Sequence, residues 1–245
     1  MIYFTSSWDD GSVYDLRLAE LLLKYNQNAT FYIPLANVEK RSVINKKQIW
    51  DLSKEFEIGA HTVNHKYLTT ISNLEAEYEI KQSKKELENI TGKQIQGFCF
   101  PGGKYHKHHL KYIQEAGFAY ARTANMFKFN NSDFLMNISL QAYNHSQYTY
   151  FKHLIKRGYF SEIIKNSTFI LTTIQWDKLL RNIVEKYIKN DSVKKITIIH
   201  LFGHSWELEE YSMWQQLEEF LKLLITIQIP SITNLNAFEL NNNIK

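Results

Sequence analysis

The chain begins with residues 1–11, MIYFTSSWDDG, in which a strand-like run ends on two adjacent carboxylates, Asp9 and Asp10. A helical pattern with leucines on one face follows over 15–25, and a second strand-like run covers 29–33. Strands that alternate with helices in this way predict an α/β fold, either a barrel or a doubly wound sheet. In α/β barrels, active sites are built at the carboxyl ends of the strands. Asp9 and Asp10 are therefore candidate functional residues, with a helix N-cap as the alternative interpretation.

The same alternation continues through most of the chain. We expect further strands at 57–60, 97–100, 118–123, 137–141, 195–200 and 231–233, and further helices at 46–54, 72–91, 106–116, 148–157, 175–190 and 212–227. No linker rich in Gly, Ser or Pro and no internal repeat interrupts the pattern. We therefore expect one domain over 1–245, with its least regular part at about 126–194.

Composition excludes several classes of protein. With 44% hydrophobic, 14% aromatic and 22% charged residues among 245, the chain can bury a core and is not disordered. A single cysteine, Cys99, rules out a disulfide scaffold. The net charge of +4 comes from scattered lysines and five arginines that form no basic stripe, so we expect no nucleic-acid partner.

Membrane and export signals are also missing from the sequence. Its most apolar stretch near the carboxyl end, 220–229, is about half as long as a transmembrane helix requires and contains Lys222. Residues 1–7 show no basic segment followed by a long apolar run, which predicts a cytoplasmic protein. The sequence leaves the oligomeric state open.

A second candidate site is the pair His61 and His65, in the stretch GAHTVNH at 59–65. Histidines four residues apart face the same side of a helical turn and can bind one cation, although such pairs are also common on helix surfaces. Together with a carboxylate, the pair would complete a two-histidine, one-carboxylate set with open positions for water. The combination favours a metal site far more than the histidine spacing alone.

A third candidate is His200, which ends the β-branched run TIIH at 197–200. At the end of a strand this histidine could donate a proton during catalysis, or it could be a structural histidine bonded to a backbone carbonyl. His204 and Glu207 follow closely, and we expect them to support His200 or to form a surface pair.

In order and spacing, these motifs resemble the polysaccharide deacetylase superfamily, the NodB-homology domain of carbohydrate esterase family four. Residues 7–11, SWDDG, correspond to its first motif, Thr-Phe-Asp-Asp-Gly, and 61–65, HTVNH, match its second, His-Ser/Thr-x-x-His. The third, Arg-x-Pro-x-Gly, is met in part by 99–103, CFPGG, and the last, Leu-x-His, corresponds to 198–200. The resemblance implies a distorted (β/α) barrel of about seven strands.

The resemblance also implies a role for each matching residue. Asp10, His61 and His65 would bind a divalent metal, zinc in particular. Asp9 would act as the general base and His200 as the general acid. Contacts with the oxyanion or the substrate would come from Gly102, Gly103, Tyr105 and His204.

One departure from the family pattern bears on the general base. Cys99 stands where the third motif has the arginine that pairs with this base. Arg122 lies on the next expected strand, in AYART at 119–123, and we predict that it reaches Asp9 from there. A surface arginine is the alternative, but an arginine inside an apolar strand is uncommon.

The activity that the resemblance implies is metal-dependent removal of an N-acyl group from an amino sugar or glycan precursor. The acyl group we expect is acetyl. The nearest alternative is the same site acting on another non-peptide C–N bond, in a formamide, a cyclic imide or a ureide. This alternative stays open because the third motif is incomplete and the family's fourth motif has no convincing counterpart. A domain that binds glycans without catalysis is the alternative from another class, although binding alone would not need both a base and an acid.

Overall fold

The computed structural model describes residues 1–127, 134–146, 148–149, 152, 155, 175–189 and 196–242. Within them, eight strands form one sheet in the order β6-β5-β4-β3-β2-β1-β8-β7, and every neighbouring pair is parallel. The strands are β1 (Ile2–Asp9), β2 (Thr30–Ile33), β3 (Glu57–Ala60), β4 (Gly97–Cys99), β5 (Tyr120–Arg122), β6 (Leu135–Met136), β7 (Leu140–Gln141) and β8 (Thr197–Gly203). The α/β fold class is confirmed, with eight strands where about seven were expected.

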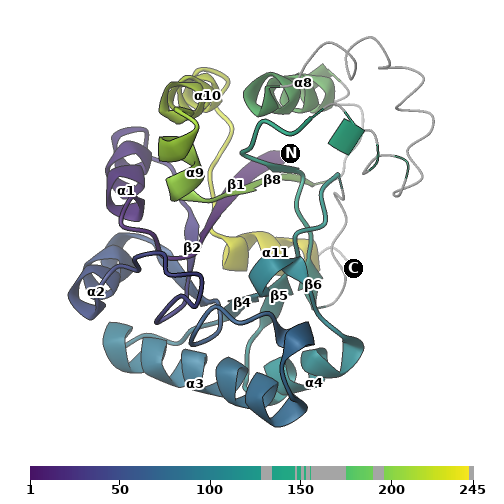
Figure 1. Ribbon diagram of the computed structural model, residues 1–245. Coiled ribbons are helices and arrows are strands. Elements are labelled where there is room, and N and C mark those ends of the chain that lie inside the picture. Colours follow the sequence, from purple (N-terminus) through teal and green to yellow (C-terminus); the bar gives the residue numbers. More distant parts are fainter. Residues whose placement is uncertain are drawn as a thin grey trace.

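Helices surround the curled sheet (Figure 1). They are α1 (Asp15–Lys24), α2 (Lys46–Glu55), α3 (Asn73–Thr91), α4 (Lys107–Glu115), α8 (Trp176–Lys189), α9 (Ser205–Glu210), α10 (Trp214–Thr226) and α11 (Asn234–Asn242). As the sequence predicts, α3 begins after Ser72, whose Oγ accepts a hydrogen bond from the N–H of Glu75, and ends at Gly92 with a φ of 68°. The helix expected at 148–157 lies largely outside the described residues. In the described part of the chain, no helix combines the length and the apolar character needed to cross a bilayer.

The two edges of the sheet are joined by a very short segment. β6 and β7 lie at opposite ends of the strand order, yet only residues 137–139 separate them in the chain. The N–H of Ser139 donates to the carbonyl of His200 on β8 (2.9 Å), and the N–H of Thr123, just after β5, donates to the carbonyl of Met136 (2.9 Å). This segment therefore bridges β5 and β8 and holds the sheet in its curled, barrel-like shape.

A buried polar network fills the amino-terminal end of the barrel. Asn234, the first residue of α11, donates from Nδ2 to the hydroxyl of Tyr32 (3.0 Å) and from its backbone N–H to Oγ1 of Thr30 (3.0 Å). Its Oδ1 accepts a hydrogen bond from Oγ1 of Thr5 (2.8 Å). Because these groups satisfy one another, they can be buried without a large desolvation cost.

Several predictions about individual elements were wrong. Of the strand expected at 137–141, only β7 at its end is present, because residues 137–139 cross from β6 at one edge of the sheet to β7 at the other. The strand expected at 231–233 is only a bridge between Ser231 and Phe4 of β1, since α11 begins directly afterwards. The helix expected at 212–227 is α10, which begins two residues later, and the separate short helix α9 precedes it.

The last strand of the sheet also has different bounds from those predicted, and this moves a candidate residue. β8 continues to Gly203, because its residues up to that point pair with β1 as far as Trp8. Leu201 and Phe202 pair with β7 on the other side. His200 therefore lies inside the strand, and the first residue beyond the strand is His204.

Candidate active site

Four candidate residues meet at the carboxyl edge of the sheet. Asp9 is the last residue of β1 and Asp10 follows it, while His61 follows β3 and His65 lies four residues further along. All four side chains are buried. The ligand atoms of Asp10 and the two histidines lie within 4.8 Å of one another, with Nε2 of His65 3.0 Å and Nε2 of His61 3.6 Å from Oδ1 of Asp10. The fold thus assembles a two-histidine, one-carboxylate set.

The backbone adopts unusual conformations to bring these groups together. The angle φ is 78° at Asp10, 65° at Thr62 and 58° at His65, and a left-handed conformation costs a non-glycine residue on the order of 1 kcal/mol. The two histidines therefore lie on an irregular loop, and not on the helical turn that their spacing suggested. Such strain is concentrated at functional sites, where the surrounding structure compensates for it.

A buried carboxylate on α3 holds this histidine loop in shape. Oε2 of Glu79 accepts hydrogen bonds from the backbone N–H groups of Val63 (2.8 Å) and Asn64 (2.9 Å), and Oε1 accepts one from Nδ2 of Asn64 (2.7 Å). Glu79 was not predicted as a functional residue. Its signal was present in the sequence, because it lies on the apolar face of α3 together with Ala76 and Ile80, where an acidic side chain needs buried partners.

The donor atoms of the set fit a divalent cation. Nδ1 of His61 lies 2.9 Å from the carbonyl oxygen of Cys99, so it donates there and leaves Nε2 as the ligand. The buried Oδ1 of Asp10 faces the Nε2 atoms of both imidazoles, and among the described residues the buried Nδ1 of His65 has no hydrogen-bond partner. Burial raises the pKa of Asp10, but His61 and His65 outweigh it and hold this pKa well below its usual range. Two imidazoles and one ionised carboxylate are a typical ligand set for zinc and similar metals.

The neighbouring carboxylate, Asp9, has different partners. The guanidinium of Arg122, on β5, donates a hydrogen bond from Nη2 to Oδ1 of Asp9, and Sγ of Cys99 lies 3.5 Å from Oδ2. Burial raises the pKa of Asp9, but the positive charge of Arg122 outweighs it and lowers the pKa below its ordinary value. Arg122 is itself buried, and its guanidinium lies over the rings of Tyr32 and Phe202 at 5.1 and 4.8 Å. The predicted contact between Arg122 and Asp9 is present.

The side chain of His200 lies in the barrel interior, contrary to its expected position at the end of a strand. Nδ1 is 3.1 Å from the carbonyl oxygen of Asn137, and Nε2 is 2.8 Å from Oγ of Ser7. Burial lowers the pKa of His200 to about 3. Both ring nitrogens are therefore engaged by the protein, and the imidazole is neutral at neutral pH.

His204 occupies the place that was expected for His200. It directly follows β8, and its side chain keeps 19% of its surface exposed. Nε2 lies 3.9 Å from Oδ2 of Asp10, and Nδ1 lies 2.8 Å from Oε2 of Glu207. Burial lowers the pKa of His204, but the hydrogen bond with Glu207 and the charge of Asp10 outweigh burial and raise this pKa to about 9. His204 and Glu207 thus form a pair at the edge of the candidate ligand set Asp10, His61 and His65, called the metal set below.

Trp206 is a further contact of the site that was not predicted from the sequence. Its Nε1 donates a hydrogen bond to Oδ2 of Asp10 (2.9 Å), on the side of the carboxylate away from the histidines. A partner of this kind orients a metal-binding carboxylate. No sequence signal could have identified it, because α9 places the indole and this short helix was not predicted.

The predicted oxyanion and substrate residues after β4 lie on a tight turn. Gly102 and Gly103 have φ values of 61° and 66°, and a side chain at Gly102 would begin 3.0 Å from the ring of Tyr67. The N–H of Gly103 already donates to the carbonyl of Phe100 (2.8 Å), which leaves Gly102 as the candidate donor. Tyr105 stacks on Phe100 with ring centroids 4.2 Å apart, and its contact with substrate stays a prediction.

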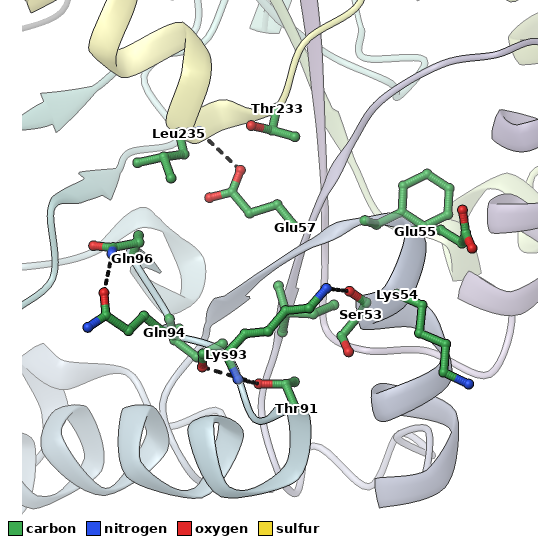
Figure 2. Close-up of a pocket in the computed structure, with 13 residues that line it drawn as sticks. Ser53, Lys54, Glu55, Glu57, Thr91, Lys93, Gln94, Gln96, Thr233 and Leu235 are labelled. Carbon is green, nitrogen blue, oxygen red and sulfur yellow. Dashed lines mark hydrogen bonds between the residues drawn. The ribbon is translucent and has the colours of Figure 1, made fainter.

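A cavity of about 280 Å³ lies at the opposite end of the strands (Figure 2). Its lining includes Glu57 at the start of β3 and Gln96 just before β4. Glu57 accepts hydrogen bonds from Oγ1 of Thr30 (2.7 Å), from the hydroxyl of Tyr120 (2.8 Å) and from the N–H of Leu235 (3.0 Å). These bonds engage the carboxylate of Glu57 in the structure of the barrel, so this cavity is not part of the candidate site.

Comparison with known proteins bears on the identity of the amino-terminal half. Residues 2–121 match the protein family described as Polysaccharide deacetylase. A peptidoglycan-N-acetylglucosamine deacetylase of Bacillus cereus is 31% identical over 114 residues, which cover 46% of this chain and 52% of that protein. The chain thus spans about half the length of this curated relative.

Solved structures match the fold over nearly the whole chain. A candidate polysaccharide deacetylase from Mycobacterium smegmatis has a TM-score of 0.69 at 14% identity, covering 99% of this chain and 90% of that one. A family 4 acetyl xylan esterase from Clostridium thermocellum, in complex with a cobalt ion, has a TM-score of 0.57 at 14% identity, covering 98% and 91%. At this identity, the likeness supports the fold alone.

Proposed function

Through residues 2–121 the chain belongs to the polysaccharide deacetylase family, whose deacetylases hydrolyse C–N bonds, and on this premise we propose that it removes an N-acetyl group from an amino sugar. One observation carries the proposal. The adjacent carboxylates Asp9 and Asp10 have separate environments, Asp9 against a guanidinium and Asp10 against two imidazoles. Two carboxylates with different partners can serve as a base and a metal ligand side by side.

The metal would be held by Asp10, His61 and His65, and zinc is the ion we propose. When bound there, it would supply Lewis-acid polarisation of the acyl carbonyl and of the attacking water. The structural support is the convergence of ligand atoms from three buried side chains, which lie within 4.8 Å of one another.

Asp9 is the proposed general base. It would take a proton from the water as the water oxygen bonds to the acyl carbon. Arg122 keeps Asp9 ionised and fixes its orientation, so the carboxylate can accept the proton at one defined position. Gly102 would donate its N–H to the oxyanion that forms on the acyl oxygen.

His204 is the proposed general acid, in place of His200. When the C–N bond breaks, the leaving amine needs a proton, and the donor must lie beside the metal set. His204 does so, at 3.9 Å from Asp10, whereas both ring nitrogens of His200 are engaged by Ser7 and Asn137. Glu207 would orient the imidazole of His204 through Nδ1.

Product analysis tests the proposed reaction against its alternatives. The intact chain is loaded with zinc and incubated with N-acetylglucosamine oligosaccharides, acetylated xylan, formamides and cyclic imides. Acetate released together with an equal amount of free amine supports N-deacetylation. Acetate without amine indicates an esterase, and formate or a ring-opened product indicates another C–N hydrolase. Zinc binding without any product would leave a glycan-binding domain and overturn the proposal.

A further inference from the structure

An exposed arginine stacks directly above the rim of the metal set. The guanidinium of Arg41 lies 3.4 Å from the ring centroid of Trp206, the residue whose indole N–H donates to Asp10. Stacking of this kind fixes the plane of a guanidinium but leaves its N–H donors free. A planar donor array is suited to bidentate binding of phosphate or carboxylate.

A second cation lies near the set in a similar arrangement, stacked on an aromatic ring that contacts a histidine of the set. Nζ of Lys104, just after the turn at Gly102 and Gly103, lies 5.0 Å from the ring centroid of Tyr67. The ring of Tyr67 in turn lies edge-on to that of His65, with centroids 6.2 Å apart. Each cation is thus separated from a metal ligand by one aromatic ring.

The loop that carries Arg41 is anchored to both metal-binding segments. The N–H of Ile44 donates to the carbonyl of Gly11 (2.8 Å), and Val43 forms a bridge with Ser12. Earlier in the loop, the N–H of Val38 donates to the carbonyl of Asn64 (3.1 Å). The position of Arg41 over the site is therefore built into the fold.

Other charged groups around the site are paired with one another, whereas Arg41 and Lys104 are not paired with a carboxylate in the described part of the chain. Asp9 is paired with Arg122, and Glu207 with His204. Within the described residues, neither Arg41 nor Lys104 forms an ion pair with a carboxylate. Of the acidic groups at this rim, Glu39 accepts a hydrogen bond from the hydroxyl of Tyr67 (2.9 Å) and supplies one opposing charge to the two cations.

We propose that Arg41 and Lys104 bind an anionic group, a phosphate or a carboxylate, on the amino sugar that the site deacylates. This inference rests on the proposed function and narrows its substrate class from neutral glycans to anionic N-acylated amino sugars. The chemistry of the two side chains is common to both anions, so the experiment must separate them.

Binding of sugars that lack an acyl group tests the inference without catalysis. Calorimetric titration of the full chain compares glucosamine with glucosamine 1-phosphate and with muramic acid, which carries a carboxylate. We expect one of the two anionic sugars to bind about 10- to 100-fold more tightly than glucosamine, as charge-assisted hydrogen bonds allow. The sugar that binds more tightly shows whether the two cations prefer a phosphate or a carboxylate. Equal binding of all three, including no measurable binding, would overturn the inference.

Variants assign the preference to these two residues. The double variant Arg41→Gln with Lys104→Gln should lose the preference for the anionic sugar while its affinity for glucosamine stays within a few-fold. Arg17→Gln is the matched control, because Arg17 also stacks on a tryptophan, Trp214 at 4.3 Å, outside the metal set. A preference that survives in the double variant, or that falls equally in the control, would contradict the inference.

Parallel assays of acetate release separate this inference from the proposed function. If N-acetylglucosamine and its 1-phosphate, or N-acetylmuramic acid, release acetate at equal kcat/KM, the proposed function stands and the anion preference fails. If no acetate appears but the anion-dependent binding persists and is lost in the double variant, the deacetylase proposal fails and the anion site stands.

Discussion

The guanidinium of Arg122 and the carboxylate of Asp9 form a buried ion pair, although the two residues are 113 positions apart in the chain. Arg122 is the register partner of Cys99 on the neighbouring strand, and Sγ of Cys99 lies 3.5 Å from the other oxygen of Asp9. Positions 99 and 122 therefore both border the proposed base. Because Arg122 pairs with Asp9 from β5, a cysteine can stand at position 99, where the resembled motif has an arginine.

Removing the guanidinium should therefore disable the base. We expect Arg122→Ala to lower kcat by about 100-fold, the low end of what a positioned base contributes, and to destabilise the fold by about 3–5 kcal/mol, because it leaves Asp9 buried and unpaired. The double variant Cys99→Arg with Arg122→Ala should recover part of both losses. Steady-state kinetics and urea unfolding check these expectations. An Arg122→Ala protein that stays folded and fully active would contradict the account.

His200, inside β8, and His204, directly after it, should respond differently to substitution. His204→Gln should lower kcat by about 100-fold or more, because the leaving amine loses its proton donor, with little change in stability. His200→Gln should act mainly on stability, since it disturbs buried hydrogen bonds with Ser7 and Asn137. Kinetics and thermal unfolding of both variants separate the roles. If His200→Gln were the inactive but stable protein, the assignment of the acid would be reversed.

His200 should also make the fold sensitive to acid. Its pKa is lowered from 6.5 to about 3 in the folded state, so between these values an unfolded chain binds a proton that the native chain does not. The contribution of His200 to the free energy of unfolding is therefore fully present above pH 6.5 and is lost as the pH falls towards 3. The difference in unfolding free energy between the intact chain and His200→Gln should therefore shrink over this range. A difference that does not change with pH would contradict the neutral, buried imidazole.

Metal binding should depend on the shape of the histidine loop as well as on the ligands. His65→Gln should abolish stoichiometric zinc binding, and Glu79→Gln should weaken it by about 10- to 100-fold, the usual effect of losing a group that supports a ligand. Zinc content and the rise in melting temperature on adding zinc report both effects. His106→Gln, at an exposed histidine outside the set, is the control. Full zinc binding by the Glu79→Gln protein would show that the loop needs no such support.

The sequence predicts the strand and helix order well, because α1 has a clear apolar face and α3 carries capping residues at both ends, Ser72 and Gly92. It also predicts Asp9, Asp10, His61 and His65 as candidate site residues, since adjacent carboxylates and paired histidines at strand ends are rare combinations, and the fold brings these four side chains together. The end of β8 could not be read from the sequence. LFG continues the apolar run after His200, and only pairing with β1 and β7 decides that the strand reaches Gly203.

Contacts made between distant elements were likewise beyond the sequence. Trp206 reaches Asp10 only because α9 begins immediately after β8, and nothing in its neighbours indicates this hydrogen bond. Glu79 was predictable in principle, as an acidic residue on an apolar helix face. Its partners Val63 and Asn64 lie on a loop of irregular conformation, which periodicity cannot describe.

The most direct measurement of the central claim is acetate release by the zinc-loaded chain and by its Asp9→Asn variant, with zinc content determined in the same samples. Because Asp9 is the proposed base and not a metal ligand, the variant should keep its zinc and lose about 100-fold or more in kcat. The account predicts zinc-dependent release of acetate with an equal amount of amine from the intact chain alone. Equal acetate release by the Asp9→Asn variant, or none from the intact chain with zinc bound, would contradict it.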